Sequence, residues 1–167
     1  MKQKRIAPSL LLLLILPLTS CFGETRLEFK IHNTNALITC IENKDKANIK
    51  RFFAPNIVSR VNSLDAQIDA LCTYWKGNNG VIAKDLGGDT IEDVDNGHKN
   101  ATIIYNFIFD IKTSESEYRL ITNWRRLDNT DKNNVGLWYL IVDPSSVGKE
   151  WNNDIKCEDY EVGITLL

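Results

Sequence analysis

The chain has 167 residues, with 20 Lys and Arg against 22 Asp and Glu and a formal net charge of −2 at pH 7. Its 43% hydrophobic and 25% charged residues are typical of one ordinary globular domain and exclude a coiled coil, a collagen-like repeat and bulk disorder. Outside the extreme N-terminus there is no run of Lys or Arg, so the basic stripe of nucleic-acid binders is missing and no nucleic-acid partner is expected.

The first twenty residues have the features of a secretory signal peptide. Lys2, Lys4 and Arg5 form a basic start, and an almost wholly apolar core follows from Ile6 to Leu18. This core is shorter than the roughly 20 residues that a membrane-spanning helix needs. Residues 1–20 are therefore predicted to be a leader that is removed from the mature protein.

The leader runs into Leu18-Thr19-Ser20-Cys21, which resembles the lipobox of bacterial lipoproteins. The resemblance implies that the Cys21 thiol carries diacylglycerol and that the leader is cut just before it, so the membrane is a partner through this lipid anchor. The alternative is an ordinary secretory signal in which Cys21 occurs by chance. Phe22 rather than Asp follows the anchor, so the expected location is the outer membrane of a double-membraned bacterium, or the outer face of the plasma membrane in a single-membraned one.

Residues 21–32 are expected to be a lipidated anchor and tether. Alternating apolar residues in the tether indicate a short first strand, and these residues are Leu27, Phe29 and Ile31. After the tether, Asn33 or Thr34 is expected to cap a first helix. The apolar side of this helix is formed by Leu37, Cys40 and Ile41.

Two more helices are predicted before the pattern changes. Asp45 is expected to cap the second helix and Pro55 to end it. Ser63 is the expected N-cap of the third helix, which has the strongest pattern, a single apolar stripe over three turns. The stripe consists of Leu64, Ile68, Leu71, Cys72 and Trp75.

From residue 81 the apolar residues recur with period two, which predicts strands. A strand at 81–84 resumes near 89–94, with a bulge or bend at Gly87-Gly88, and further strands are expected at 99–111, 118–124 and 135–141. The predicted fold class is α+β, with N-terminal helices packed on an antiparallel four-stranded sheet. Residues 143–167 are expected to form a C-terminal tail with one short strand at 162–167, on an edge or hanging free.

The run from Ser63 to Leu71, followed by Gly77, resembles a family of small bacterial lipoproteins of unknown function. The resemblance covers about residues 33–142 and also includes Gly87-Gly88 and the Gly-containing apolar strand from Val135 to Val142. It implies an NTF2-like/cystatin-like cone, in which helices fold into the concavity of a strongly curved sheet. The chain departs from the family in its longer tail and in acidic residues where the family has more glycine. No catalytic residue is implied.

Cys40, Cys72 and Cys157 remain once Cys21 carries lipid. Cys40 and Cys72 lie on the apolar faces of predicted helices, so they are either buried free thiols or a disulfide pair. The cysteine spacing resembles no zinc site. The acidic residues between Asp85 and Asp95 are interpreted as a solvated sheet edge, the alternative being a weak calcium site. No metal and no cofactor are expected.

The candidate ligand-binding residues are Tyr105, Trp124 and Arg126. The two aromatic residues are expected near the mouth of the cone. Arg126 is expected to follow Trp124 toward the buried side, where it would need a carboxylate partner or an anionic ligand. The alternatives are core packing for the two aromatic residues and an exposed strand end for Arg126. His32 and His98 are expected to be exposed, and Asp110 is expected to face water. The sequence has no nucleophile elbow, P-loop or His-Glu-x-x-His motif.

These observations favour a membrane-anchored, extracytoplasmic and non-enzymatic module that binds a small ligand or an envelope protein. One specific version is an immunity-type lipoprotein that neutralises a toxin at the envelope. The alternative function is that of a small cone-fold enzyme using general acid–base catalysis, which requires a carboxylate paired with His or Tyr inside the cone. Fold alone does not decide between these two functions.

Overall fold

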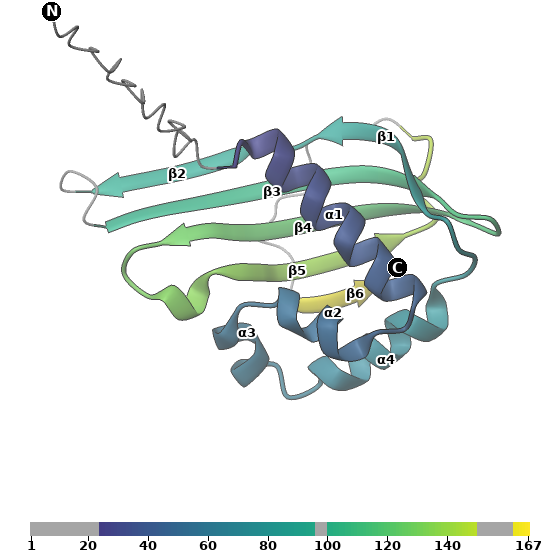
Figure 1. Ribbon diagram of the computed structural model, residues 1–167, viewed down its shortest axis with the longest axis horizontal. Coiled ribbons are helices and arrows are strands. Elements are labelled where there is room, and N and C mark those ends of the chain that lie inside the picture. The colour runs from purple at the N-terminus through teal and green to yellow at the C-terminus, as the bar shows by residue number, and fades with distance from the viewer. Residues whose placement is uncertain (1–23, 96–99, 150–161) are drawn as a thin grey trace, which may run out of the picture.

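The computed structural model describes residues 24–95, 100–149 and 162–167. These residues form an α+β domain in which helices cover one face of a curved sheet (Figure 1). The helices of this part of the chain are α1 (Arg26–Glu42), α2 (Lys46–Phe52), α3 (Pro55–Arg60), α4 (Leu64–Tyr74) and the short 3-10 helix η1 (Lys132–Asn134). Its strands are β1 (Val81–Gly87), β2 (Thr90–Asp95), β3 (Asn100–Lys112), β4 (Glu117–Asp128), β5 (Gly136–Asp143) and β6 (Gly163–Leu166).

Helix α1 begins earlier than the sequence pattern predicts. Thr25 is its N-cap, and a capping box joins the Thr25 side chain to the backbone N–H of Glu28 and the Glu28 carboxylate to the backbone N–H of Thr25. The expected strand at 27–31 and the expected cap at Asn33 or Thr34 are therefore wrong. Most of the segment expected to be a tether belongs to the domain, as the first two turns of α1.

Helices α2 and α4 follow the predictions more closely, whereas α3 was not predicted. Asp45 caps α2 by accepting a hydrogen bond from the Asn48 backbone N–H at 3.1 Å. Pro55 follows the end of α2 and also occupies the first turn of α3. Its missing N–H costs no hydrogen bond there, because the first N–H groups of a helix have no acceptor within the helix. Ser63 is the N-cap residue of α4, although its side chain makes no capping hydrogen bond. The predicted stripe of α4 is confirmed, and its buried residues are Leu64, Ile68, Leu71 and Cys72.

The sheet is mixed, and the described residues contribute six strands to it rather than the four predicted. β3, β4 and β5 are antiparallel neighbours, and β1 and β2 both pair with β3, along different parts of its length. β1 ends at Gly87 and β2 begins at Thr90, so the break includes Gly88, one of the two glycines at which the sequence indicates a bulge or bend. A Cβ on Gly88 would lie 1.9 Å from the Asn106 carbonyl oxygen, so only glycine fits this close approach.

β5 contains an irregularity that the alternation does not reveal. Asn123 pairs with Tyr139 and Trp124 pairs with Leu137, so Trp138 has no partner in the ladder. Leu137 consequently belongs to the core beneath the helices, whereas Tyr139 belongs to a cluster on the opposite face. The alternation of residues 135–141 places all the odd positions on one side, and this prediction is wrong across the bulge.

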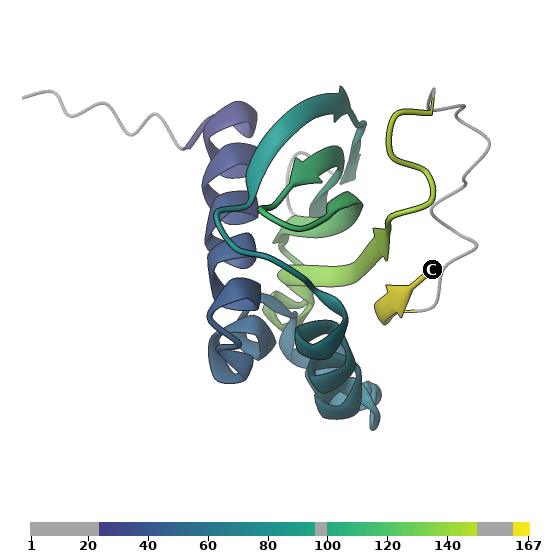
Figure 2. The same cartoon turned by 90° about the vertical axis from the view of Figure 1, so that its right-hand side faces the viewer.

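Both faces of the sheet bury side chains. The main core lies between the helices and the concave face, and a second cluster of Ile108, Ile121, Tyr139 and Ile141 lies on the convex face. The segment that follows β5 runs on this convex side, opposite α1 (Figure 2). Asp110 is only 5% exposed here and pairs with Arg119, so the expectation that Asp110 faces water is wrong.

The predicted strand at 162–167 is confirmed as β6. It pairs with β5 in parallel and lies on the sheet edge next to α4, rather than hanging free. The Gln67 side chain accepts a hydrogen bond from the Ile164 backbone N–H at 2.9 Å, and the Tyr74 hydroxyl donates to the Leu167 carbonyl at 2.7 Å. These two side chains of α4 satisfy backbone groups of the terminal strand that would otherwise face water.

Candidate functional site

The candidate ligand-binding residues converge beneath the first two turns of α1, and Phe29 is the residue that joins them. The Phe29 ring meets Tyr105 edge-on at 5.6 Å and Trp124 at 5.7 Å between centroids. Phe52 and Phe107 complete the group, which we call the aromatic cluster. Such edge-to-face contacts are worth about 0.5–1.5 kcal/mol each beyond the area they bury.

The register of β3 and β4 explains why Tyr105 and Trp124 share this place. The two residues are direct partners across the ladder, so their side chains leave the same face of the sheet. Arg126 lies two positions beyond Trp124 and reaches the same side, with its guanidinium 5.0 Å from the Phe29 ring centroid. Arg125 is directed elsewhere, because it stacks on Trp138 and pairs with Asp128.

Two arginines border the aromatic cluster. Arg126 has a carboxylate partner, since its guanidinium lies 3.9 Å from Glu24. Arg26 lies over Tyr105 at 5.9 Å and donates to the Gly88 carbonyl at 2.9 Å. Cation–π contacts of this partly exposed kind are worth about 0.5–1 kcal/mol. The arginines therefore fasten the beginning of α1 to β4 and to the glycine bend.

Lys30 is a buried cation on the same helix. Its ammonium forms an ion pair with Asp85 of β1 and lies 4.9 Å from the Phe109 ring centroid. Only 7% of Lys30 is exposed, which is unusual for lysine. With residues 27–31 interpreted as a strand, the sequence gives no signal that Lys30 faces inward.

The aromatic cluster is packed and is not an open pocket. Trp124 is 3% exposed and Tyr105 is half-buried, and Phe29 packs against both rings in edge-type contacts. The indole N–H of Trp124 is buried and has no hydrogen-bond acceptor among the described residues. A ligand that stacks on Tyr105 and Trp124 would have to displace Phe29 first.

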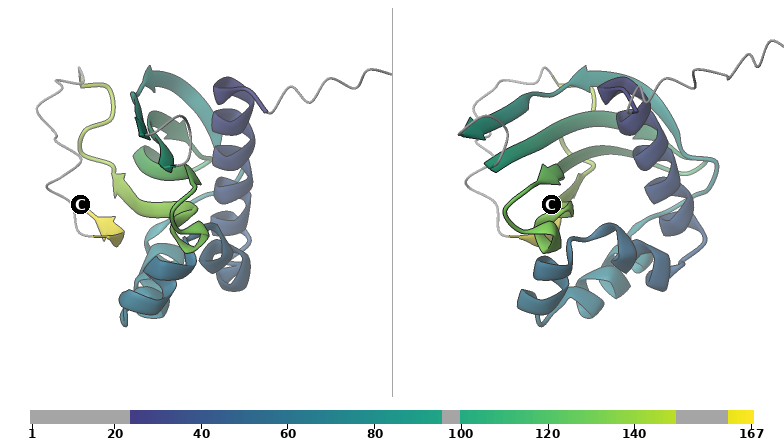
Figure 3. Two further views of the ribbon diagram at one scale, coloured as in Figure 1. Left: turned by 90° about the vertical axis from the view of Figure 1, so that its left-hand side faces the viewer. Right: turned by 60° about the vertical axis from the view of Figure 1, so that its left-hand side comes forward.

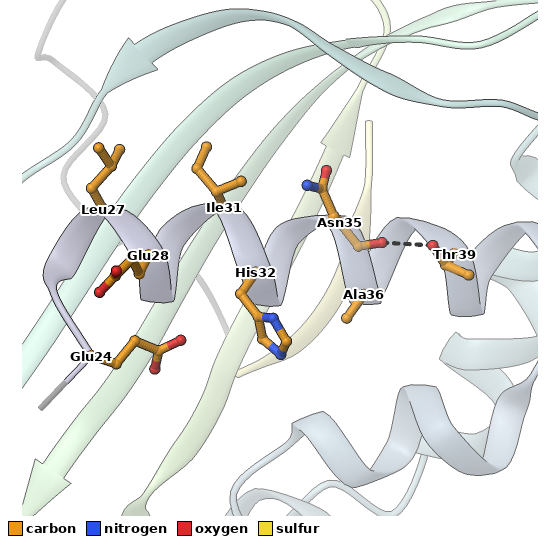
Figure 4. Close-up of a pocket in the computed structure, with 8 residues that line it drawn as sticks. All are labelled: Glu24, Leu27, Glu28, Ile31, His32, Asn35, Ala36 and Thr39. Carbon is orange, nitrogen blue, oxygen red and sulfur yellow. Dashed lines mark hydrogen bonds between the residues drawn. The ribbon is translucent and has the colours of Figure 1, made fainter. Parts of the chain in front are cut away.

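A shallow concavity lies on the outer face of α1, away from the sheet. All of its lining residues come from α1 and the turn before it, and they include Leu27, Ile31 and His32 (Figure 4). Leu27 is 63% exposed and Ile31 is 36% exposed. A wall made by one helix encloses no small molecule, so this feature is an open apolar face.

Of the two histidines, the structure describes His32. His32 is exposed on the outer face of α1, as expected, and it faces away from the concave side of the sheet. It therefore does not supply the carboxylate–His pair inside the cone that the enzymatic alternative requires. His98 lies outside the described residues, as does the turn that contains it.

The cysteines of the described segments are separate thiols. Cys40 is half-buried on α1 and Cys72 is buried on α4, and no disulfide joins them. Burial, with a smaller effect of the negative Asp45, raises the pKa of the Cys40 thiol, and burial also raises the pKa of the Cys72 thiol. Cys21 and Cys157 lie outside the described residues.

The described residues contain neither a grouped set of metal ligands nor a membrane-spanning helix. Within residues 24–95, 100–149 and 162–167, no three His, Cys, Asp or Glu side chains are grouped to hold a metal ion. Asp85, the first acid of this edge, is paired with Lys30. None of the helices that the structure describes is long and apolar enough to cross a membrane.

Fold and site together define an α+β domain with a filled concave face and an apolar helix surface on its outside. Residues 36–150 match the family described as Domain of unknown function (DUF5104). The match spans more than half of the chain, so the protein belongs to this family. No curated protein matches the chain. The first turns of α1, with Phe29 and Lys30, precede the matched residues.

Proposed function

We propose that this protein is a lipid-anchored, extracytoplasmic domain of a bacterial cell envelope that acts by binding another envelope protein and not by catalysis. The observation that carries the anchor is Leu18-Thr19-Ser20-Cys21, which follows a basic start and an apolar core in the order of a lipoprotein leader. The capping box at Thr25 supports the same arrangement, because it begins the folded domain only four residues after Cys21.

We also propose that the fold is an NTF2-like cone. A long helix, α1, crosses the concave side of the curved sheet, and the shorter helices lie together at one end of it (Figure 3). Helices folded into the concavity of a bent sheet are the arrangement that the resemblance implies. The parallel pairing of β6 with β5 adds a strand to this arrangement without changing the side on which the helices lie.

Protein binding is favoured over capture of a small ligand by the packing of the aromatic cluster. Phe29 contacts Tyr105, Trp124 and, through its ring face, Arg126, so the side chains suited to a ligand already bind one another. Displacing Phe29 would expose apolar area and cost stability. The immunity-type version of this proposal adds that the partner is a toxin encoded beside this protein.

The anchor is tested by metabolic labelling with palmitate in a bacterial host, followed by mass spectrometry of the intact protein. The wild-type chain should be labelled, lose residues 1–20 and sediment with membranes. Cys21→Ser should abolish the label, whereas Cys40→Ser, the matched control for a thiol that stays free, should keep it. An unlabelled wild-type chain that retains its leader would refute the proposal.

The mode of action is tested by recovering the lipidated protein from the envelope under native conditions. We expect a protein partner that re-forms a complex of fixed stoichiometry when both purified components are mixed. A small molecule recovered in stoichiometric amount, with its binding abolished by Trp124→Ala, would show capture of a ligand instead. If no recovered protein re-forms a complex with the purified chain, the proposed binding of an envelope protein is wrong.

A further inference from the structure

We propose that the outer face of the N-terminal half of α1 lies on the lipid bilayer, with Leu27 and Ile31 in the headgroup layer. The inference rests on the lipid anchor of the proposed function and adds to it a second attachment and an orientation. The contact is made by the open apolar face described above, which begins at the N-terminal end of α1.

The first observation is the short chain between the anchor and the fold. Cys21 precedes Glu24 by three residues, and three extended residues span at most about 11 Å. Helix α1 begins at Arg26. If Cys21 carries lipid in the membrane, the first turn of α1 is held close to the surface of the bilayer, whatever path residues 21–23 take.

The second observation is the character of the face that is held there. Leu27 and Ile31 are four residues apart, so they lie one above the other on the same side of α1 (Figure 4). They are the two exposed large hydrophobic residues of α1. Asn35 continues the same row one turn later and is polar and exposed. The apolar character of the face is therefore strongest next to the anchor and ends after two turns.

The charges near this face fit a zwitterionic lipid surface. The face is also lined by Glu24, Glu28 and the exposed His32, and Glu24 is paired with Arg126. Glu28 is held by the capping box, where it accepts hydrogen bonds from the Thr25 backbone and hydroxyl at 2.8 and 2.9 Å. The face carries no excess of positive charge, so strong attraction to anionic lipids is not expected and a zwitterionic lipid surface is the better match.

The contact does not need to be strong. The anchor makes insertion of Leu27 and Ile31 an intramolecular event, so that an apolar contact too weak to bind the free domain still populates the docked state. Helical surfaces with aliphatic residues on one face bury that face at the boundary between headgroups and acyl chains. Without the anchor the same face should bind vesicles only weakly.

The test measures depth in the membrane along α1. The lipidated chain, with Cys40→Ser, Cys72→Ala and Cys157→Ser, receives one spin label through Leu27→Cys, Ile31→Cys or Asn35→Cys and is reconstituted into phosphatidylcholine vesicles. Val81→Cys is the matched control, because Val81 is 57% exposed and lies far from the N-terminal end of α1. It follows Gly80, whose backbone N–H donates a hydrogen bond to Glu42 at the C-terminal end of α1. Each variant is first checked by circular dichroism and urea unfolding.

We expect accessibility to oxygen relative to a water-soluble nickel complex to be several-fold higher at position 27 than at 81, intermediate at 31, and close to the control at 35. Adding Leu27→Asp should return the label at 31 to the control value, whereas Val81→Asp should not. Four equal values in membrane-bound protein would overturn the docked face and leave the anchor intact. Protection at 27 and 31 that appears only when a second protein is added would assign the face to that partner and also overturn the inference. A chain that lacks lipid and stays in solution would instead refute the proposed function.

Discussion

Asp110 on β3 and Arg119 on β4 are direct partners across the ladder and form a buried bidentate ion pair. The Arg119 Nε lies 2.8 Å from one carboxylate oxygen and Nη2 lies 3.1 Å from the other. Arg119 also donates to the Lys149 carbonyl at 3.0 Å, so the pair holds the segment after β5 against the convex face of the sheet. This pair explains how two charged residues are accommodated between apolar neighbours.

Removing Arg119 should destabilise the fold strongly. Arg119→Met leaves the Asp110 carboxylate buried without a counter-charge, and we expect a loss of about 3–5 kcal/mol in the free energy of unfolding, measured in urea. Lys112→Met is the matched control, because Lys112 pairs with Glu117 on the same two strands but both side chains are exposed. The control should lose less than about 1 kcal/mol. Equal losses in the two variants would show that the burial of the pair is unimportant.

Phe29 should matter more than its more exposed neighbour Leu27. Phe29→Ala removes the ring that joins Tyr105 and Trp124, and we expect it to cost about 2–3 kcal/mol, somewhat less than a fully buried Phe. Leu27→Ala removes an exposed side chain from the same helix and should change stability by less than about 0.5 kcal/mol in the unlipidated domain. If residues 26–32 were a tether, both substitutions would be neutral.

Asp128 organises the turn between β4 and β5. Burial of Asp128 raises the pKa of its carboxyl, but hydrogen bonds from Thr130, Asp131 and Asn134 outweigh burial and hold that pKa well below its usual range. The carboxylate accepts from the Thr130 hydroxyl at 2.6 Å and from the Asp131 backbone N–H at 3.0 Å. Because the folded state favours the charged form, Asp128 stabilises the fold at neutral pH.

The stabilisation by Asp128 should disappear in acid. The unfolded carboxyl has its usual pKa of about 3.9, so the contribution is complete well above pH 4 and declines as the pH falls toward the lower folded value. Asp128→Asn should therefore be about 2–3 kcal/mol less stable than wild type at pH 7, with a difference that shrinks steadily toward pH 2 in urea titrations. Asp65→Asn, at an exposed position, is the control. A difference independent of pH would contradict the assignment to charge.

Cys40 and Cys72 should remain reduced and react slowly. Both thiols have a raised pKa because they are buried, so little thiolate is present at neutral pH. In the Cys21→Ser, Cys157→Ser background, a thiol-specific dye should label Cys40 slowly and the more buried Cys72 more slowly still, with full labelling only in denaturant. A native protein that lacks two hydrogens by mass spectrometry and reacts with no dye would instead contain the disulfide.

The beginning of α1 shows where periodicity fails as a guide. Leu27, Phe29 and Ile31 satisfy the period-two pattern of a strand, yet residues 27 and 31 are also four apart and share a helical face. The sequence does contain the deciding signal, since Thr25 and Glu28 have the spacing of a capping box. Phe29 was consequently absent from the predicted site, although it contacts Tyr105, Trp124 and Arg126.

The sheet was predictable where its two faces differ. The strand at 99–111 and the stripe of α4 were found because their apolar residues have a regular period. The burial of Asp110 was not predictable, because in a single sequence a charged residue that is paired inside the fold cannot be distinguished from one on a solvent-exposed face. The bulge at Trp138 moves the side chains that follow it to the other face of the sheet, and no residue near it indicates this shift in the sequence.

Of the candidate site, the sequence identified Tyr105, Trp124 and Arg126, and the structure brings all three against one ring. The sequence did not show that Phe29 of the same chain occupies the place expected for a ligand. That fact depends on α1 reaching back to residue 26 and crossing β4, which is a long-range arrangement that local patterns do not encode.

The parallel pairing of β6 with β5 affects the order in which the protein assembles. Antiparallel β3, β4 and β5 are consecutive in the chain and can pair early, whereas residues 163–166 come 20 residues after the end of β5 and pair with it in parallel. We expect their amide hydrogens to exchange with solvent sooner than those of the central strands. The β5 edge of the sheet therefore stays unpaired until residues 163–166 have been synthesised and have folded onto it.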